Sequence, residues 1–254
     1  MKPILFNTEM VKAILDGRKK VTRRNPFHFT MKEGYNPNWS GYSLGEYFTG
    51  HIESGVCLYS RGAHDVWGVR SNIVKPKYNV NDILYVRETW SEWTDGYVYK
   101  IPDNKASYNY PASYIWKWNP SIHMPKEAAR IFLRVKDVRV ERLQDMPHDA
   151  PLEEGIKGYT KDGELYKYAV SDDWWIDYHS KHRKEFKGTY WQDMPKNPTV
   201  AFSYLWNSTI NRTDIDIYGW EANPWVWVIE FERISKEEAL NQPSTASSPH
   251  QKSE

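Results

Sequence analysis

The chain has almost no cysteine: among its 254 residues, Cys57 is the single thiol. One thiol cannot form an internal disulfide or a cysteine-rich zinc site. Disulfide-stabilised secreted scaffolds are therefore excluded, and a reducing, cytoplasmic location is the expectation. No neighbour in the sequence marks Cys57 for activation as a nucleophile, so we interpret it as a small buried apolar residue.

Long apolar runs are also missing, and the mean hydropathy is -0.77. No stretch approaches the ~18 apolar residues that cross a bilayer, and the apolar start of the chain is too short for a signal peptide. We therefore expect no membrane partner. The net charge is only +1, so any attraction to nucleic acid must come from a local cluster of cations.

Several common site signatures are absent from the sequence. There is no phosphate-binding glycine loop, no dinucleotide glycine fingerprint and no recognisable Ser-His-Asp arrangement. Asp173, Asp177, His179 and His182 share one segment, but their spacing fits no standard metal motif. We expect neither a cofactor nor a metal site.

Aromatic residues, by contrast, are abundant, with 13 Trp and 18 Tyr. Such side chains fill cores, and they also stack on nucleobases. Trp90 is one candidate for a stacking wall, although packing in the core is the more common role of such a residue.

The first 17 residues predict a strand, a helix and a turn. Residues 3–6 are apolar, and Asn7 or Thr8 can cap a following helix. Gly17 stands where a left-handed helix end is expected. The helix itself is indicated by apolar residues at spacings of three and four, namely Met10, Val11, Ile14 and Leu15.

The rest of the pattern predicts an α+β fold, a small β-barrel with flanking helices. Strands are expected over 83–88, 130–143 and 223–232, and helices over 149–156 and 201–210. Within 130–143 the alternation of apolar residues shifts phase near Asp137, which predicts a β-bulge of the kind that helps to close small barrels.

One domain is expected over residues 1–236. Weak periodicity and loop-like composition indicate loop-rich insertions at about 26–76, 91–120 and 157–196. Residues 237–254 are polar and predict a disordered tail.

The segment 18–24 is the strongest candidate for a binding site. Five of its seven residues are cations: Arg18, Lys19, Lys20, Arg23 and Arg24. Arg and Lys bind phosphate oxygens strongly, so one interpretation is recognition of a phosphate or a base. The other is a solvated charged run beside a helix end, and the spacing alone does not separate the two.

Chemistry at this segment requires a hydroxyl, an amine and a carboxylate. A desolvated lysine loses its proton more easily and can then accept one from Thr22. Glu153 and Glu154 end a predicted helical turn, and either one can supply the carboxylate. Both glutamates can equally be surface residues of a short helix.

Three further polar candidates lie outside the basic segment. Arg87 can bind a phosphate and Glu88 can pair with the segment 18–24, although a structural ion pair is the more common role for each. His123 can line a pocket, or it can be a hydrogen-bonded structural histidine.

Four motifs together resemble the ASCH domains of the PUA-like group. They are Gly-Arg-Lys-x-x-Thr-x-Arg at 17–24, Asp-Ile-Leu-x-Val-Arg-Glu at 82–88, Glu-Gly at 154–155, and a closing hydrophobic strand. The resemblance covers residues 2–90 and 130–233, without the insertions. Phage- and prophage-encoded members also share Trp-x-Pro-Ser-Ile-His-Met-Pro, here 118–125, and Asn-Pro-Trp-Val-Trp-Val, here 223–228.

The resemblance implies a cleft for RNA, a nucleotide or a modified base. Some small members remove the acetyl group of N4-acetylcytidine, and by motif their site corresponds to Lys19, Thr22 and Glu154. Other members are described as ribonucleases. This chain departs from the pattern at Lys20, where threonine is common, and in the Glu153-Glu154 doublet.

Two functions follow as alternatives. The first is recognition of a nucleotide, a modified nucleoside or nucleic acid, with RNA favoured, and hydrolysis as its possible chemistry. In that case Arg18, Lys20, Arg23, Arg24, Arg87, Glu88, Trp90 and His123 are the candidate binding residues. The second is a non-catalytic phage accessory protein whose insertions bind a host or virion protein.

Overall fold

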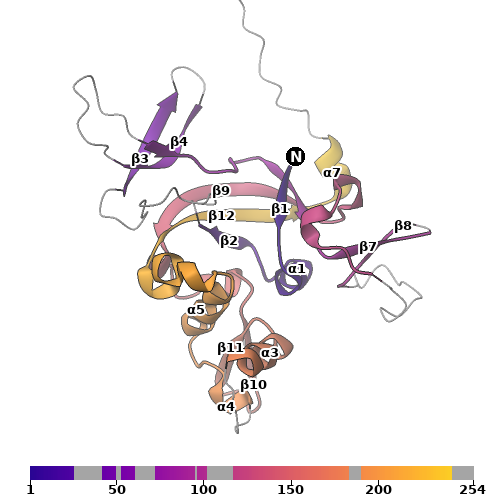
Figure 1. Ribbon diagram of the computed structural model, residues 1–254, viewed down its shortest axis with the longest axis vertical. Coiled ribbons are helices and arrows are strands. Elements are labelled where there is room, and N and C mark those ends of the chain that lie inside the picture. The colour runs from indigo at the N-terminus through magenta and orange to yellow at the C-terminus, as the bar shows by residue number, and fades with distance from the viewer. Residues whose placement is uncertain are drawn as a thin grey trace, which may run out of the picture.

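The computed structural model describes residues 1–25, 42–49, 53–60, 72–94, 96–101, 117–182 and 190–241. Residues 26–41, Cys57's side chain and most of the expected tail therefore lie outside the described part. The described residues form a mixed α and β structure around one five-stranded sheet (Figure 1).

The central sheet has the strand order β1-β6-β9-β12-β2. Its strands are β1 (Lys2–Leu5), β2 (Val21–Arg24), β6 (Ile83–Arg87), β9 (Phe132–Arg142) and β12 (Trp225–Ile234). β1 runs parallel to β6, and the other neighbours are antiparallel. The strands expected near residues 3–6, 83–88, 130–143 and 223–232 are thus confirmed.

The sheet is open, so the predicted closed barrel is wrong. The predicted bulge is present: the β12–β9 register shifts between Glu230, opposite Asp137, and Phe231, opposite Val135. Within the described strands, however, β1 and β2 remain edges and do not pair. One side chain connects these two edge strands instead: the Arg24 guanidinium, from β2, donates to the carbonyl of Leu5 in β1 at 2.6 Å.

Both faces of the sheet are covered, which explains why the first four residues of β6, Ile83 to Val86, are all apolar and buried. Leu84 and Val86 pack into one cluster, with the helices α1 (Thr8–Leu15) and α5 (Pro198–Ser208). Ile83 and Tyr85 pack into a second cluster, with Trp90 and Met124. Alternation therefore separates two apolar environments here, rather than core from solvent.

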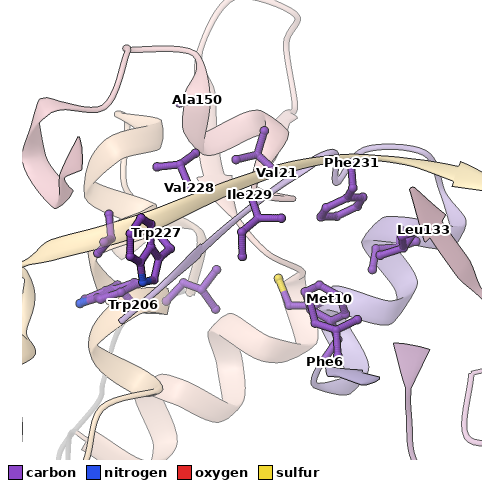
Figure 2. Close-up of a cluster of buried hydrophobic side chains, with 14 of the residues drawn as sticks. Phe6, Met10, Val21, Leu133, Ala150, Trp206, Trp227, Val228, Ile229 and Phe231 are labelled. Carbon is purple, nitrogen blue, oxygen red and sulfur yellow. The ribbon is translucent and has the colours of Figure 1, made fainter. Parts of the chain in front are cut away.

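The larger cluster joins α1 (Thr8–Leu15) and α5 (Pro198–Ser208) to the sheet, and Figure 2 shows Phe6, Met10, Trp206 and Trp227 among its members. Asn7 caps α1 by accepting a hydrogen bond from the Met10 amide at 2.9 Å. Gly17 follows the helix with φ of +74°, as its position predicts.

The insertions add small sheets and helices at the margins (Figure 1). The first contains β3 (Tyr42–Thr49), β4 (Glu53–Ser60) and β5 (Asn72–Val74), which form a separate three-stranded sheet. β7 (Trp90–Trp93) pairs with β8 (Gly96–Tyr99) in the second. The third contains β10 (Lys157–Thr160), β11 (Tyr166–Ala169), α3 (Asp172–His182) and α4 (Tyr190–Asp193).

The remaining helices are short. They are α2 (Ala150–Glu153), α6 (Ile215–Tyr218) and α7 (Lys236–Asn241). The predicted disordered tail is wrong for residues 237–241, which belong to α7, because Ala239 is buried in the second cluster. Residues 242–254 lie outside the described part. No helix among the described residues is long and apolar enough to span a membrane.

Candidate functional site

The basic segment is a turn followed by a strand. After Gly17, the amides of Arg18 and Lys19 both donate to the carbonyl of Ala13, and the amide of Lys20 donates to Glu153. β2 begins only at Val21. The turn places the Lys19 side chain inward, where a strand alone would have set it on the face opposite to Thr22.

Lys19 is buried and its ammonium group has three acceptors. The Nζ atom donates to a Glu154 carboxylate oxygen at 2.6 Å, to the Glu154 carbonyl at 2.9 Å and to the Val21 carbonyl at 2.8 Å. Three acceptors match the three N–H groups of a protonated lysine. Burial nevertheless lowers the pKa of Lys19, and the Glu154 carboxylate opposes that shift.

Glu154 has a second cationic partner on its other oxygen. The Arg23 guanidinium donates to Oε1 of Glu154 at 3.1 Å and lies 3.4 Å from a Glu141 carboxylate oxygen. Both Arg23 and Glu154 are buried. Glu153 is exposed, so Glu154 is the member of the doublet that reaches the basic segment.

Lys19, Thr22 and Glu154 line one pocket of about 80 Å³. The Thr22 hydroxyl has no hydrogen-bond partner among the described residues, so it is available to a ligand. Arg23 and Arg24 also line this pocket, which we call the triad pocket. The remaining walls come from α1, α5 and their flanks: Phe6, Asn7, Met10, Phe202, Leu205, Trp206 and Thr209.

The triad pocket is electropositive. Its lining contains the cations Lys19, Arg23 and Arg24 and the single carboxylate Glu154, a formal charge of +2. Low-dielectric surroundings strengthen the field of these charges on anything that enters. The pocket therefore favours an anion, a carbonyl oxygen or another electron-rich group.

Two of the five cations do not line the pocket. Arg18 forms an ion pair with Asp16 at 3.1 Å and donates to the carbonyl of Gly155. Lys20 is exposed. Four cations of segment 18–24 are predicted to bind a nucleotide. Arg23 and Arg24 line the pocket, whereas the turn at Gly17 directs Arg18 and Lys20 away from it.

Arg87 and Glu88 belong to another part of the molecule. Arg130 binds Glu88 through two hydrogen bonds, at 2.9 and 2.8 Å. The possible pairing of Glu88 with the basic segment is thus wrong, and the structural ion pair is confirmed. Arg87 donates to the carbonyl of Ile122 at 3.1 Å.

Trp90 and His123 also lie away from the triad pocket. Trp90 is buried in the second cluster and meets the edge of Tyr97, with ring centroids 5.7 Å apart. His123 is exposed on a short 3-10 helix (Ser121–His123). Neither lines the triad pocket, so the structure does not bring them to this site, and their role in nucleotide binding stays a prediction.

Sequence reasoning missed the aromatic and apolar wall of the pocket. The helix expected over 201–210 carries Phe202, Leu205 and Trp206 on one stripe. These side chains belong to the larger apolar cluster and also line the pocket. The available signal was Thr209, which continues the same stripe with a hydroxyl.

The four residues considered for a metal lie in or near α3, where Asp177 pairs with Lys181 and His179 packs against Trp175. Among the described residues, no group of three potential ligands could hold a metal ion.

The candidate site is a buried cluster of Lys19, Glu154 and Arg23 beside the Thr22 hydroxyl, which has no partner among the described residues. No protein-family model, curated protein or solved structure matches this chain.

Proposed function

We propose that the triad pocket recognises a nucleotide or a modified nucleobase and hydrolyses an acyl group on it, in a fold of the PUA-like ASCH type. The observation that supports this proposal is the convergence of the Lys19 ammonium, the Glu154 carboxylate and the Thr22 hydroxyl on one pocket. These side chains come from segments 135 residues apart in sequence. The proposal places the base between the apolar side chains of α5 and the cations of β2, which line the pocket.

The proposed chemistry begins with a proton transfer inside the cluster. Lys19 passes a proton to Glu154 along the 2.6 Å hydrogen bond, and burial, which lowers the pKa of Lys19, reduces the cost of that step. Arg23 opposes it by stabilising the ionised carboxylate. The neutral amine then accepts a proton from Thr22 or from a water molecule.

The oxygen that loses this proton attacks the acyl carbon. The bond between that carbon and the exocyclic nitrogen breaks, and the amine leaves with a proton returned by the cluster. Water supplies the oxygen of the released acid, directly or by hydrolysing an ester on Thr22. Arg24 is placed to stabilise negative charge on the acyl oxygen.

Thr22→Val tests this proposal, because valine keeps the shape of threonine and removes only the hydroxyl. We expect wild-type protein to bind cytidine or N4-acetylcytidine and to release acetate from the latter. Thr22→Val should lose release of acetate and weaken binding about tenfold, the value of one lost hydrogen bond at a polar site. Calorimetry measures the binding, and chromatography measures the products.

Two results would contradict the proposal. One is the absence of binding across a panel of modified nucleosides and short RNAs and DNAs. The other is undiminished turnover in Thr22→Val, which would remove Thr22 from the mechanism. Thr213→Val is the matched control, because Thr213 is exposed and does not line the triad pocket, and its hydroxyl already donates to the Asp214 carboxylate at 3.1 Å.

One observation favours a second function, a non-catalytic binding protein. All three N–H groups of Lys19 are used inside the protein, which is the arrangement of a structural ion cluster. In that case Lys19 and Glu154 hold the turn against α2, and the insertions bind a protein partner. Binding without turnover, unchanged in Thr22→Val, would favour this function.

A further inference from the structure

The triad pocket is too small for a complete nucleotide. Its volume is about 80 Å³, whereas pockets that bury whole small ligands measure roughly 300–1,000 Å³. A ligand held there through its base must leave its sugar and phosphate outside. Where the pocket opens, and against which residues, therefore decides the class of ligand.

A second cavity of about 790 Å³ adjoins the triad pocket. Asn7 and Thr209 line both, so one opens beside the other. α3, the end of α5 and the segment 207–215 form this second cavity, and Figure 1 places α3 and α5 at the same end of the molecule. α3 belongs to the insertion at 157–196, which the ASCH resemblance does not cover.

One wall of the second cavity is aromatic. Trp174 and Tyr178 stack on each other, with ring centroids 5.1 Å apart and planes 23° apart. Both side chains are only half-buried. Partly exposed aromatic side chains of this kind are the surfaces on which unpaired bases stack, with little preference for sequence.

The same cavity presents cations. Arg212 is exposed and forms no ion pair with any described residue. Lys181 pairs with Asp177 at 2.5 Å, but both are well exposed, and such pairs are weak. Two cations and one carboxylate give the lining a formal charge of +1.

The end of α5 repels an anionic neighbour less than a helix C-terminus with free carbonyls does. Ser208 and Thr209 donate their hydroxyl hydrogens to the carbonyls of Leu205 and Trp206, at 2.6 and 2.7 Å. These bonds satisfy carbonyls that a helix leaves free at its C-terminus, and so weaken the negative end of the helix dipole.

From this arrangement we infer that the ligand is a nucleotide within a single strand. Its base enters the triad pocket, its phosphate lies near Arg212, and the neighbouring base stacks on Trp174 and Tyr178. The inference rests on the proposed function, because it assigns the part of the same ligand that the triad pocket cannot hold. It excludes a free nucleoside as the preferred ligand.

A length series tests the inference on the full-length protein. Cytidine, cytidine 5′-monophosphate and trinucleotides of RNA and of DNA are compared in equilibrium binding at several salt concentrations. We expect at least tenfold tighter binding of a trinucleotide than of cytidine. Arg212→Ala should weaken the trinucleotide severalfold, lower the slope of log affinity against log salt by about 0.7, and leave cytidine unaffected.

Lys126→Ala is the matched control, since Lys126 is an exposed cation on a 3-10 helix (Lys126–Ala128) beside the second cluster. It should change neither affinity nor salt slope. The RNA and DNA arms show which strand is preferred, and either preference supports the inference. Equal affinity for cytidine and trinucleotides, or an Arg212→Ala variant that binds trinucleotides like wild type, would overturn it.

The results that would contradict the proposed function differ from those that would contradict this inference. If trinucleotides bind in an Arg212-dependent way and Thr22→Val changes nothing, the second cavity binds the strand as inferred, and the proposed role of the triad pocket is wrong. If cytidine binds in a Thr22-dependent way and a longer strand binds no more tightly, only the inference about the second cavity is contradicted. Binding of no nucleoside, nucleotide or strand would overturn both.

Discussion

Replacing Glu154 with alanine is expected to lower the free energy of unfolding by about 3–5 kcal/mol, the usual cost of removing one partner from a buried ion pair. Glu154 is the only carboxylate that contacts Lys19 among the described residues. Without it, the Lys19 ammonium and the Arg23 guanidinium stay buried and lose the carboxylate that both of them contact. Arg23 retains Glu141 at 3.4 Å, so Lys19 is the more destabilised of the two.

Urea unfolding followed by circular dichroism measures this loss. Glu153→Ala is the matched control, because it removes the exposed carboxylate next in sequence and should change stability by under about 0.5 kcal/mol. The double variant Lys19→Met, Glu154→Leu should recover much of the loss, since apolar residues can replace a buried pair at little cost. A Glu154→Ala protein as stable as Glu153→Ala would contradict the importance of this cluster.

The local part of this site could be predicted from the sequence. Asn7, the apolar stripe of α1 and Gly17 specify a capped helix that ends in a left-handed turn, because capping and positive φ depend on neighbouring residues alone. The expectation that Lys19 and Thr22 share a pocket came from a motif resemblance, and the geometry brings them together. Their catalytic role stays a prediction.

Contacts between residues far apart in the sequence could be predicted less well from the sequence. Nothing local to Glu154 distinguishes it from Glu153, and the difference arises because α2 ends at Glu153 and the chain turns inward at Gly155. The shape of segment 18–24 depends on the same kind of contact. Hydrogen bonds from Arg18 and Lys19 to Ala13 keep the first part of that segment in a turn.

Whether the sheet closes into a barrel could not be predicted from the sequence either. The bulge opposite Glu230 was predicted because it interrupts the alternation of β9 itself. Whether β1 and β2 then meet depends on the combined twist of five strands, which no single segment encodes. Arg24, predicted only as a ligand-binding cation, also bridges the two edges through Leu5.

The turn that carries Glu154 inward depends on Gly155, and Gly155→Ala is expected to cost about 2–5 kcal/mol of stability. Gly155 has φ of +106°, where a side chain costs about 1–2 kcal/mol. In addition, a Cβ atom there would lie 2.9 Å from the Cβ of Ala13. Overpacking of this kind costs about 1–3 kcal/mol more, and relief would push α2 away from α1 and Glu154 away from Lys19.

Gly17→Ala separates the two contributions. Gly17 also has a positive φ, +74°, but a Cβ atom there would meet nothing within 4 Å. This variant should therefore lose only the conformational part, about 1–2 kcal/mol. Combining Gly155→Ala with Ala13→Gly removes the clash and should recover part of the larger loss, despite the lower helix propensity of glycine, about 1 kcal/mol. Equal destabilisation in Gly155→Ala and Gly17→Ala would mean that α2 does not rest against α1 at Ala13, and the buried position of Glu154 beside Lys19 would lose its structural basis.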